Sequence, residues 1–364
     1  MPLVGGTLER YFGMRFLSAV LLTFVGVFAL VALIDYIEMV RRASDIPHVS
    51  PLLVAKVSFF RVPQVSERLM PFCILIGAMS CYLNLSRRLE LVIARSAGMS
   101  AWQFIAPALV VAFLLGIIAT AVYNPVSAYM QERSKRYETE LFGQRSSGLS
   151  LGGNSWLSQR DSDGQTIINA KSSRDQGTTL NGVSVFTFDN AGHFKQRIEA
   201  RAAVLEPGAW RLLGTRIYAL NTLPVDQAVY RLDTRLTPEQ VRERFATPES
   251  VPFWELPQYI QLAEHAGLGA AGYRFQFQRL LARPFLLVAM VFLAAAVSLR
   301  FFRLGGIQKM VLSGVGAGFL LYVLSKVTED LSKAELMHPV TAAWLPVLAG
   351  GLTGFIALLY QEDG

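Results

Sequence analysis

The stretch Ser86-Arg-Arg-Leu-Glu-Leu-Val-Ile-Ala-Arg-Ser-Ala-Gly-Met-Ser100 separates two long apolar runs, 69–85 and 101–130, that contain no charged residue. Leu89, Ile93 and Ala97 recur at i, i+4 and i+8, the spacing of one face of an α-helix. Gly98 follows the last periodic residue, where a glycine commonly ends a helix. The pattern predicts a short amphipathic helix over 86–98, lying at a membrane surface with its charged face toward the cytoplasm. The alternative is a solvated basic loop that only fixes the topology.

The composition is that of a polytopic α-helical membrane protein. The 364 residues are 52% hydrophobic and only 17% charged, whereas soluble domains carry roughly 25% charged residues. Several runs reach the length of about 20 apolar residues that crosses a bilayer. The six expected spans are 16–40, 65–85, 101–123, 275–299, 307–327 and 340–360. We also expect a possible interfacial helix over 52–61, and an end or kink of the third span at Asn124-Pro125.

The charges of the short connectors predict the orientation. Connectors 86–100 and 300–309 carry net charges of +2 and +3, whereas 35–68 and 326–338 carry +1 and −1. Because basic connectors stay in the cytoplasm, both termini and the 86–100 connector are expected there. The segment between the third and fourth spans is then external, in the periplasm of a Gram-negative cell.

That external segment has the pattern of an all-β domain. Short alternating segments such as 165–170, 183–188 and 200–205 are separated by turn residues. We expect a sandwich or jelly-roll domain over 131–272, between helical parts at 1–130 and 273–364. Residues 131–274 hold 17 Lys and Arg against 16 Asp and Glu. Most of the +7 net charge therefore lies in the membrane part, and nucleic-acid binding is a poor explanation for it.

Catalytic and metal-site signals are weak. There is no P-loop pattern, so any ATP would be hydrolysed by a partner. Ser150 matches Gly-x-Ser-x-Gly, but it lies in a Gly/Ser-rich linker and not between a strand and a helix. The four histidines are scattered without ligand spacing. We therefore predict no catalytic residue, no metal site and no cofactor.

Two further patterns point to lipid handling. Gly314 and Gly318 allow close helix approach in the fifth span, either as ordinary packing or as a mobile contact. Basic residues gather at the outer membrane edge, where they contact headgroups or recognise a phosphorylated lipid. The candidates are Arg41, Arg42, Arg61, Arg68, Arg133 and Arg136, with Lys135, Arg279 and Arg283 nearby.

The segments 8–11 (Leu-Glu-Arg-Tyr) and 89–98, Pro284 and the three-plus-three layout together resemble the YjgP/YjgQ permease family, which comprises LptF and LptG of the lipopolysaccharide exporter. The similarity covers essentially the full length and is stronger to the LptG branch. It implies an ABC-type permease subunit of the bacterial inner membrane that extracts lipopolysaccharide and passes it to a periplasmic β-domain bridge. The implied partners are LptF in a heterodimer, a cytoplasmic LptB ATPase dimer and the bridge protein LptC.

The resemblance also implies roles for individual residues. The ATPase would dock on the connector, at Arg88, Glu90, Leu91, Arg95 and Gly98. Lipid would pass between the first and fifth spans of the two partners, near Ile34, Phe319 and Tyr322, and its acyl chains would meet Val183, Val185, Phe186 and Phe188. Asp35 departs from the pattern, because LptG proteins carry a lysine near this position.

Within the connector, Glu90 and Arg95 are five residues apart and point to different helix faces. We expect Glu90 to pair with the ATPase, and Arg95 to contact headgroups or the permease itself. Two other function classes stay open at this point. One is a non-transporting scaffold or mechanical subunit of an ABC complex, and the other is a membrane lipid-modifying enzyme.

Overall fold

The computed structural model describes residues 3–44, 50–142, 155–161, 164–174, 178–189, 193–219, 223–234, 248–265, 270–304 and 307–362. Six of the helices in these residues are long and apolar enough to cross a membrane. Three precede the sheet and three follow it, which confirms the three-plus-three layout. The chain forms two compact units, one of Met1–Lys135 with Pro248–Gly364 and the other of Arg136–Thr247.

The first three spans are α1 (Leu3–Ala43), α2 (Pro51–Arg87), and α4 (Ala101–Ile118) continuing into α5 (Asn124–Phe142). The separate interfacial helix expected before Pro63 is wrong, since α2 runs through both Pro63 and Pro71. Each proline removes only one backbone hydrogen bond, and the long apolar helix tolerates that loss. The short helix α3 (Glu90–Ser96) lies between α2 and α4.

The third span does not end at Asn124-Pro125. A π-helical turn, η1 (Ala119–Tyr123), joins α4 to α5, and the helix continues to Phe142. Pro125 has no N–H to donate to the carbonyl of Ala121, so that oxygen is free for another donor. The indole N–H of Trp254 donates to it at 3.1 Å.

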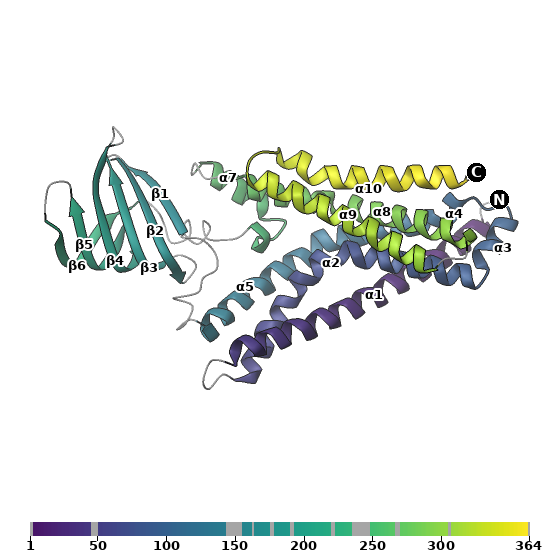
Figure 1. Cartoon of the computed structure of the whole chain (residues 1–364), viewed down its shortest axis with the longest axis horizontal. Helices are drawn as coiled ribbons and strands as arrows, with labels where there is room; N and C mark the ends of the chain where they lie inside the picture. Colours follow the sequence, from purple (N-terminus) through teal and green to yellow (C-terminus); the bar gives the residue numbers. More distant parts are fainter. Residues whose placement is uncertain are drawn as a thin grey trace. The chain divides into compact units, whose positions relative to one another are not determined.

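The last three spans are α8 (Ala271–Leu304), α9 (Ile307–Lys333) and α10 (Pro339–Glu362). The 3-10 turn η3 (Pro248–Ser250) and the amphipathic helix α7 (Leu256–His265) precede them and belong to the helical unit. Helix α8 is central, because it packs against α2, α4, α9 and α10. In Figure 1 both chain ends lie beside α3, at the same end of this unit.

The second unit contains a six-stranded antiparallel sheet in its described residues, with the strands paired in sequence order. The strands are β1 (Ser155–Asp161), β2 (Gly164–Arg174), β3 (Thr179–Phe188), β4 (Phe194–Glu206), β5 (Ala209–Ala219) and β6 (Val225–Asp233). The all-β prediction is confirmed, but these strands form a meander without the crossing connections of a jelly roll. The unit is also shorter than the expected 131–272, because α5 continues beyond residue 131 while η3 and α7 pack with the helices.

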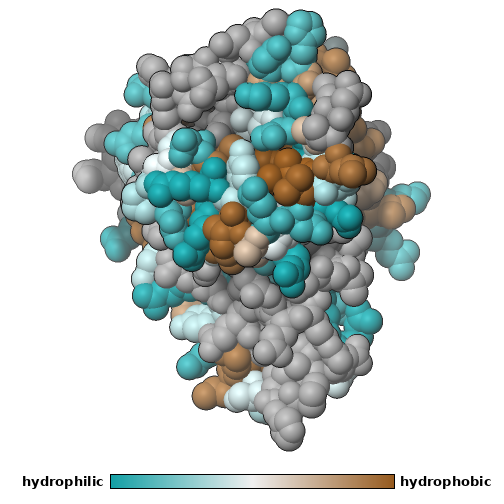
Figure 2. Space-filling model, turned by 90° about the vertical axis from the view of Figure 1, so that its left-hand side faces the viewer, coloured by the Kyte–Doolittle hydropathy of each residue, from teal (hydrophilic) through white to brown (hydrophobic). Residues whose placement is uncertain are grey.

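The sheet has one apolar face. Ile168, Val185, Ile198, Trp210 and Leu212 belong to its core, and in β3 and β4 the buried residues largely alternate with half-buried or exposed ones. On the face of the molecule shown in Figure 2, hydrophobic residues (brown) form small groups surrounded by hydrophilic residues (teal).

Candidate functional site

The connector forms the predicted helix, although it is shorter than expected. Leu89 adopts a left-handed conformation, with a φ of 59°, and separates α2 from α3. Gly98, with a φ of 85°, follows the end of α3 in a conformation that costs little only for glycine. Gly98 therefore fixes the end of the helix.

The two apolar faces of α3 have different surroundings. Leu91 and Ala94 are buried in the core of the helical unit and attach α3 to it. Only 4% of Leu91 is exposed, so its side chain fastens α3 to the bundle, and its part in ATPase coupling stays a prediction. Leu89, Val92 and Ile93 remain exposed, Ile93 by 64%. An apolar surface of this kind on a short charged helix favours contact with another protein.

The charged residues of the connector also differ in exposure and in their contacts. Arg88 and Arg95 are exposed, and within the described part of the chain neither side chain makes a hydrogen bond or an ion pair. Glu90 is half-buried, and its Oε2 accepts a hydrogen bond of 3.0 Å from the hydroxyl of Tyr11. Arg15 donates from Nε to the same hydroxyl at 3.0 Å, with its guanidinium 5.2 Å from the centre of the Tyr11 ring. These three residues connect α1 to the start of α3.

Three of the predicted lipid-binding arginines are already paired within the chain. Arg41 and Arg42 both contact Glu38 at 2.8 Å. Arg61 lies 3.5 Å from Asp35, so the acid that departs from the family pattern joins α1 to α2. A base neutralised inside the chain is less available to a phosphate.

Two of these arginines remain more available. Arg68 is exposed, and no ion pair joins it to another described residue. Arg133 is exposed, and among the described residues its side chain contacts the uncharged Tyr129, with its guanidinium 4.8 Å from the centre of the ring. Arg136 lies in α5, but its side chain is outside the described residues.

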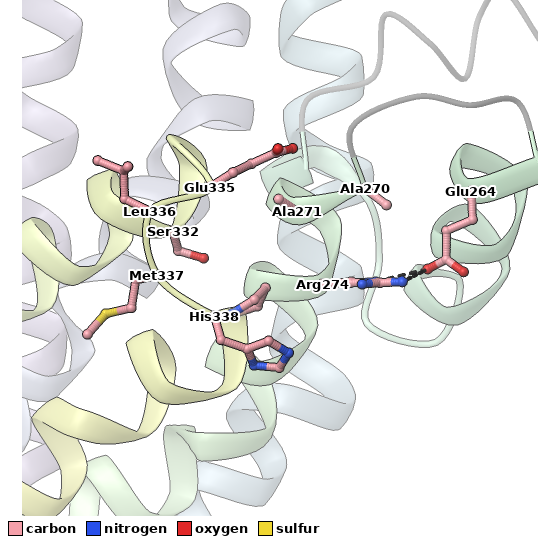
Figure 3. A pocket seen from close by; sticks show the side chains of 10 residues that line it. Glu264, Ala270, Ala271, Arg274, Ser332, Glu335, Leu336, Met337 and His338 are labelled. Atoms are coloured by element: carbon pink, nitrogen blue, oxygen red, sulfur yellow. Dashed lines mark hydrogen bonds and ion pairs between the residues drawn. The ribbon is translucent and has the colours of Figure 1, made fainter.

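A cavity of about 590 Å³ opens where α9 turns into α10. Figure 3 shows Arg274 of α8 pointing toward Glu264 of α7, with Nε 2.9 Å from the carboxylate, while Glu335 and His338 line other parts of the wall. Because its arginine is paired, this cavity is a poorer phosphate site than the surfaces around Arg68 and Arg133.

The predicted gate residues lie on exposed helix faces. Ile34 and Phe319 are 58% and 59% exposed, and Tyr322 packs its ring 5.7 Å from that of Phe72. Gly314 and Gly318 face side chains of α2, because a Cβ on either would lie 2.5 Å from Met79 or Leu75. The two glycines therefore contribute to packing within this chain, whereas Ile34 and Phe319 are free to face lipid or another protein.

A comparison with known proteins decides the family. The model of the family "Lipopolysaccharide export system permease LptF/LptG" matches residues 10–360. The chain belongs to the LptF/LptG family of permeases. It is similar to the lipopolysaccharide export system permease protein LptG of Haemophilus influenzae, with 25% identity over 94% of this chain and 95% of that protein. It is also similar to LptG of Escherichia coli K12, with 21% identity over 94% of each chain.

The sheet of this LptF/LptG permease divides the four predicted acyl-contact residues between its faces. Val183 and Val185 belong to the apolar core. Phe186 points to the opposite face, where the guanidinium of Arg197 lies 5.7 Å from its ring centre. Because successive residues of a strand alternate, Phe186 lies on the face opposite Val185, and its contact with acyl chains stays a prediction. Phe188 is half-buried beside Phe194, next to an irregularity in the β3–β4 pairing.

Sequence reasoning missed a buried polar cluster in the helical unit. Glu67 of α2 and Arg283 of α8 are 5% and 9% exposed, with Arg283 Nη1 donating to Glu67 Oε1 at 2.6 Å. The amide of Asn124 donates to the same carboxylate at 2.8 Å, and the hydroxyl of Ser127 donates to its other oxygen. Arg283 is therefore a structural residue and not a headgroup contact.

The only signal in the sequence for this cluster was the presence of charged residues in apolar segments, which marks functional or structural sites without identifying the partner of each charge.

The predicted non-catalytic Ser150 lies outside the described residues. Among those described, no group of three His, Cys, Asp or Glu side chains could hold a metal ion.

Proposed function

We propose that this chain is the LptG-type subunit of an ABC exporter of lipopolysaccharide in the bacterial inner membrane. It pairs with LptF, an LptB ATPase dimer docks on α3 in the cytoplasm, and the sheet lies in the periplasm. There the sheet passes lipopolysaccharide to LptC. Its similarity to LptG proteins over 94% of the chain supports the choice of subunit.

The exposed face of α3 carries this proposal. Leu89, Val92 and Ile93 are exposed beside the half-buried Glu90, on a helix held to the bundle by Leu91. Burying a large aliphatic side chain contributes roughly 1.5–3 kcal/mol. A desolvated ion pair between Glu90 and a base of the ATPase would add specificity, because losing one member of such a pair costs about 2–5 kcal/mol.

The test is charge reversal at Glu90. Glu90→Lys should reduce co-purification of the ATPase and lower both ATP turnover and export, while the permease heterodimer still assembles. Glu9→Lys is the matched control, since Glu9 is an exposed acid in the first turns of α1. A base-to-acid change in the ATPase groove should partly restore function to Glu90→Lys. Wild-type ATPase binding by Glu90→Lys would contradict docking at this residue.

The lipid path follows from the exposed helix faces. Ile34 of this chain would face the fifth span of LptF, and Phe319 with Tyr322 would face its first span. Phosphates would meet Arg68 and Arg133, neither of which forms an ion pair with a described acid. Acyl chains would follow the apolar face of the sheet.

Stimulation of ATP turnover by lipopolysaccharide separates this proposal from a scaffold role. A scaffold subunit would show no stimulation. Disulfide cross-links from Ile34→Cys or Phe319→Cys to the facing span of LptF should stop export when oxidised. Full cross-linking with unchanged export would contradict a gate at these helices.

A further inference from the structure

Helix α1 packs against α2 and α4 along its length, and three of its contacts mark its start, middle and end. At its start, Tyr11 donates to Glu90 of α3. In its middle it crosses α2, where a Cβ on Gly77 would lie only 2.8 Å from the Cα of Val20. Near its end, Asp35 pairs with Arg61 of α2 at 3.5 Å.

The two halves of α1 differ in burial. Phe12, Phe16 and Val20 belong to the core of the helical unit. Beyond this point Leu21, Leu22, Val25, Leu30, Leu33 and Ile34 are all exposed. The first half therefore packs into the core, whereas the second half keeps one face against its own chain, where Met39 is fully buried, and turns the other outward.

One continuous helix joins the contact with α3 to the exposed face near Ile34. Tyr11 lies nine residues before Val20 and Ile34 fourteen residues after it, which is about 14 Å and 21 Å along the helix axis. Helix α1 runs from Leu3 to Ala43 and contains no proline. A shift of its first turns would therefore be carried along the helix toward Ile34.

We propose that the Tyr11 hydroxyl, oriented by Arg15, is a positioning group that transmits the position of α3 to the exposed half of α1. The inference rests on the proposed docking of the ATPase at α3. Glu90 has two carboxylate oxygens, and Tyr11 uses only Oε2. A base of the ATPase can bind Oε1 while the hydrogen bond to Tyr11 persists. A movement of α3 driven by ATP then reaches α1 through a hydrogen bond to a charged acceptor, supported by the Arg15 guanidinium.

The first experiment compares Tyr11→Phe with the wild type in the complete reconstituted exporter, in proteoliposomes containing lipopolysaccharide. The substitution removes one oxygen atom and keeps the ring. We expect lipopolysaccharide released per ATP hydrolysed to fall about ten-fold, which corresponds to about 1.4 kcal/mol, the scale of one hydrogen bond to a charged group. Tyr360→Phe is the matched control, because Tyr360 is exposed near the end of α10, at the same end of the unit.

A second readout follows the movement itself. Spin labels on Leu33→Cys and Leu336→Cys would report the distance between α1 and the α9–α10 turn, since both positions are exposed. The native Cys73 and Cys81 are buried and do not compete for the label. ATP should shift this distance in the wild type and in Tyr360→Phe, but not in Tyr11→Phe. A role of Tyr11 in stability alone would lower the yield of the complex and leave the shift unchanged.

An unchanged release per ATP, or a retained distance shift, in Tyr11→Phe would overturn the proposal. If this variant fails to assemble, Arg15→Lys provides the same test, because it keeps the charge but removes the Nε donor. Both variants are measured in complexes that retain the ATPase. A failure of docking at Glu90, seen with Glu90→Lys, is therefore distinct from a failure of transmission through Tyr11.

Discussion

The buried Glu67–Arg283 pair yields the sharpest prediction on stability. In Arg283→Met, Glu67 keeps its hydrogen bonds from Asn124 and Ser127 but loses its countercharge at a site that is 5% exposed. Leaving a buried charge unpaired costs about 3–5 kcal/mol. Glu67→Gln leaves the guanidinium unpaired and should cost a similar amount. The double variant removes both charges, so we expect it to be more stable than either single variant.

The free energy of unfolding can be measured by SDS titration of the purified protein in mixed micelles. The four proteins of the cycle should give a coupling energy of about 2 kcal/mol or more between the two positions. Arg274→Met is the control, because it breaks a largely exposed ion pair with Glu264 and should cost less than about 1 kcal/mol. Additive effects in the cycle, or an Arg283→Met variant within 1 kcal/mol of the wild type, would refute the reasoning.

Three further predictions concern other contacts. Gly77→Leu should force α1 away from α2 at Val20, because even a Cβ at position 77 would lie 2.8 Å from the backbone of Val20. Export should fall, and labelling of α1 from the lipid phase should change. Wild-type values of both would contradict a close crossing. Burial alone would raise the pKa of Glu249, but Lys333 at 3.1 Å holds it below its ordinary value. The ion pair therefore stabilises the folded protein above about pH 4.3, and this stabilisation disappears as the pH falls through the lowered pKa of Glu249. The temperature of thermal unfolding should therefore fall less on acidification in Glu249→Gln than in the wild type. Arg68→Ala should weaken the stimulation of ATP turnover by lipopolysaccharide several-fold, and an unchanged stimulation would remove Arg68 from the lipid path.

Features with a local sequence pattern were predictable. The six spans, the connector helix and its end at Gly98 follow from hydrophobic runs, helical periodicity and one glycine. The all-β character of the inserted domain follows from alternation and turn residues. These signals act within a few residues of one another, so the sequence displays them directly.

Contacts between distant residues were not predictable. Tyr11 and Glu90 are 79 residues apart, and Glu67 and Arg283 are 216 apart. No local rule joins such residues. The burial of Leu91 and the side of the sheet that Phe186 faces could not be predicted for a related reason, because periodicity defines the faces of an element without saying which face meets the core. Pro63 lies inside α2 because the helical residues on both sides of it hold its conformation, which the local sequence around the proline does not indicate.

The sequence separation of Glu67 and Arg283 also bears on how the chain enters the membrane during synthesis. The acid belongs to the second span and its countercharge to the fourth, with the whole sheet between them. At about 5–20 residues per second, the ribosome needs roughly 10–40 s to reach the arginine after the glutamate. During that interval the first three spans form an incomplete bundle with an acidic group and no countercharge. Until the fourth span arrives, Glu67 can stay neutral by holding a proton, or it can use the hydrogen bonds that Asn124 and Ser127 provide.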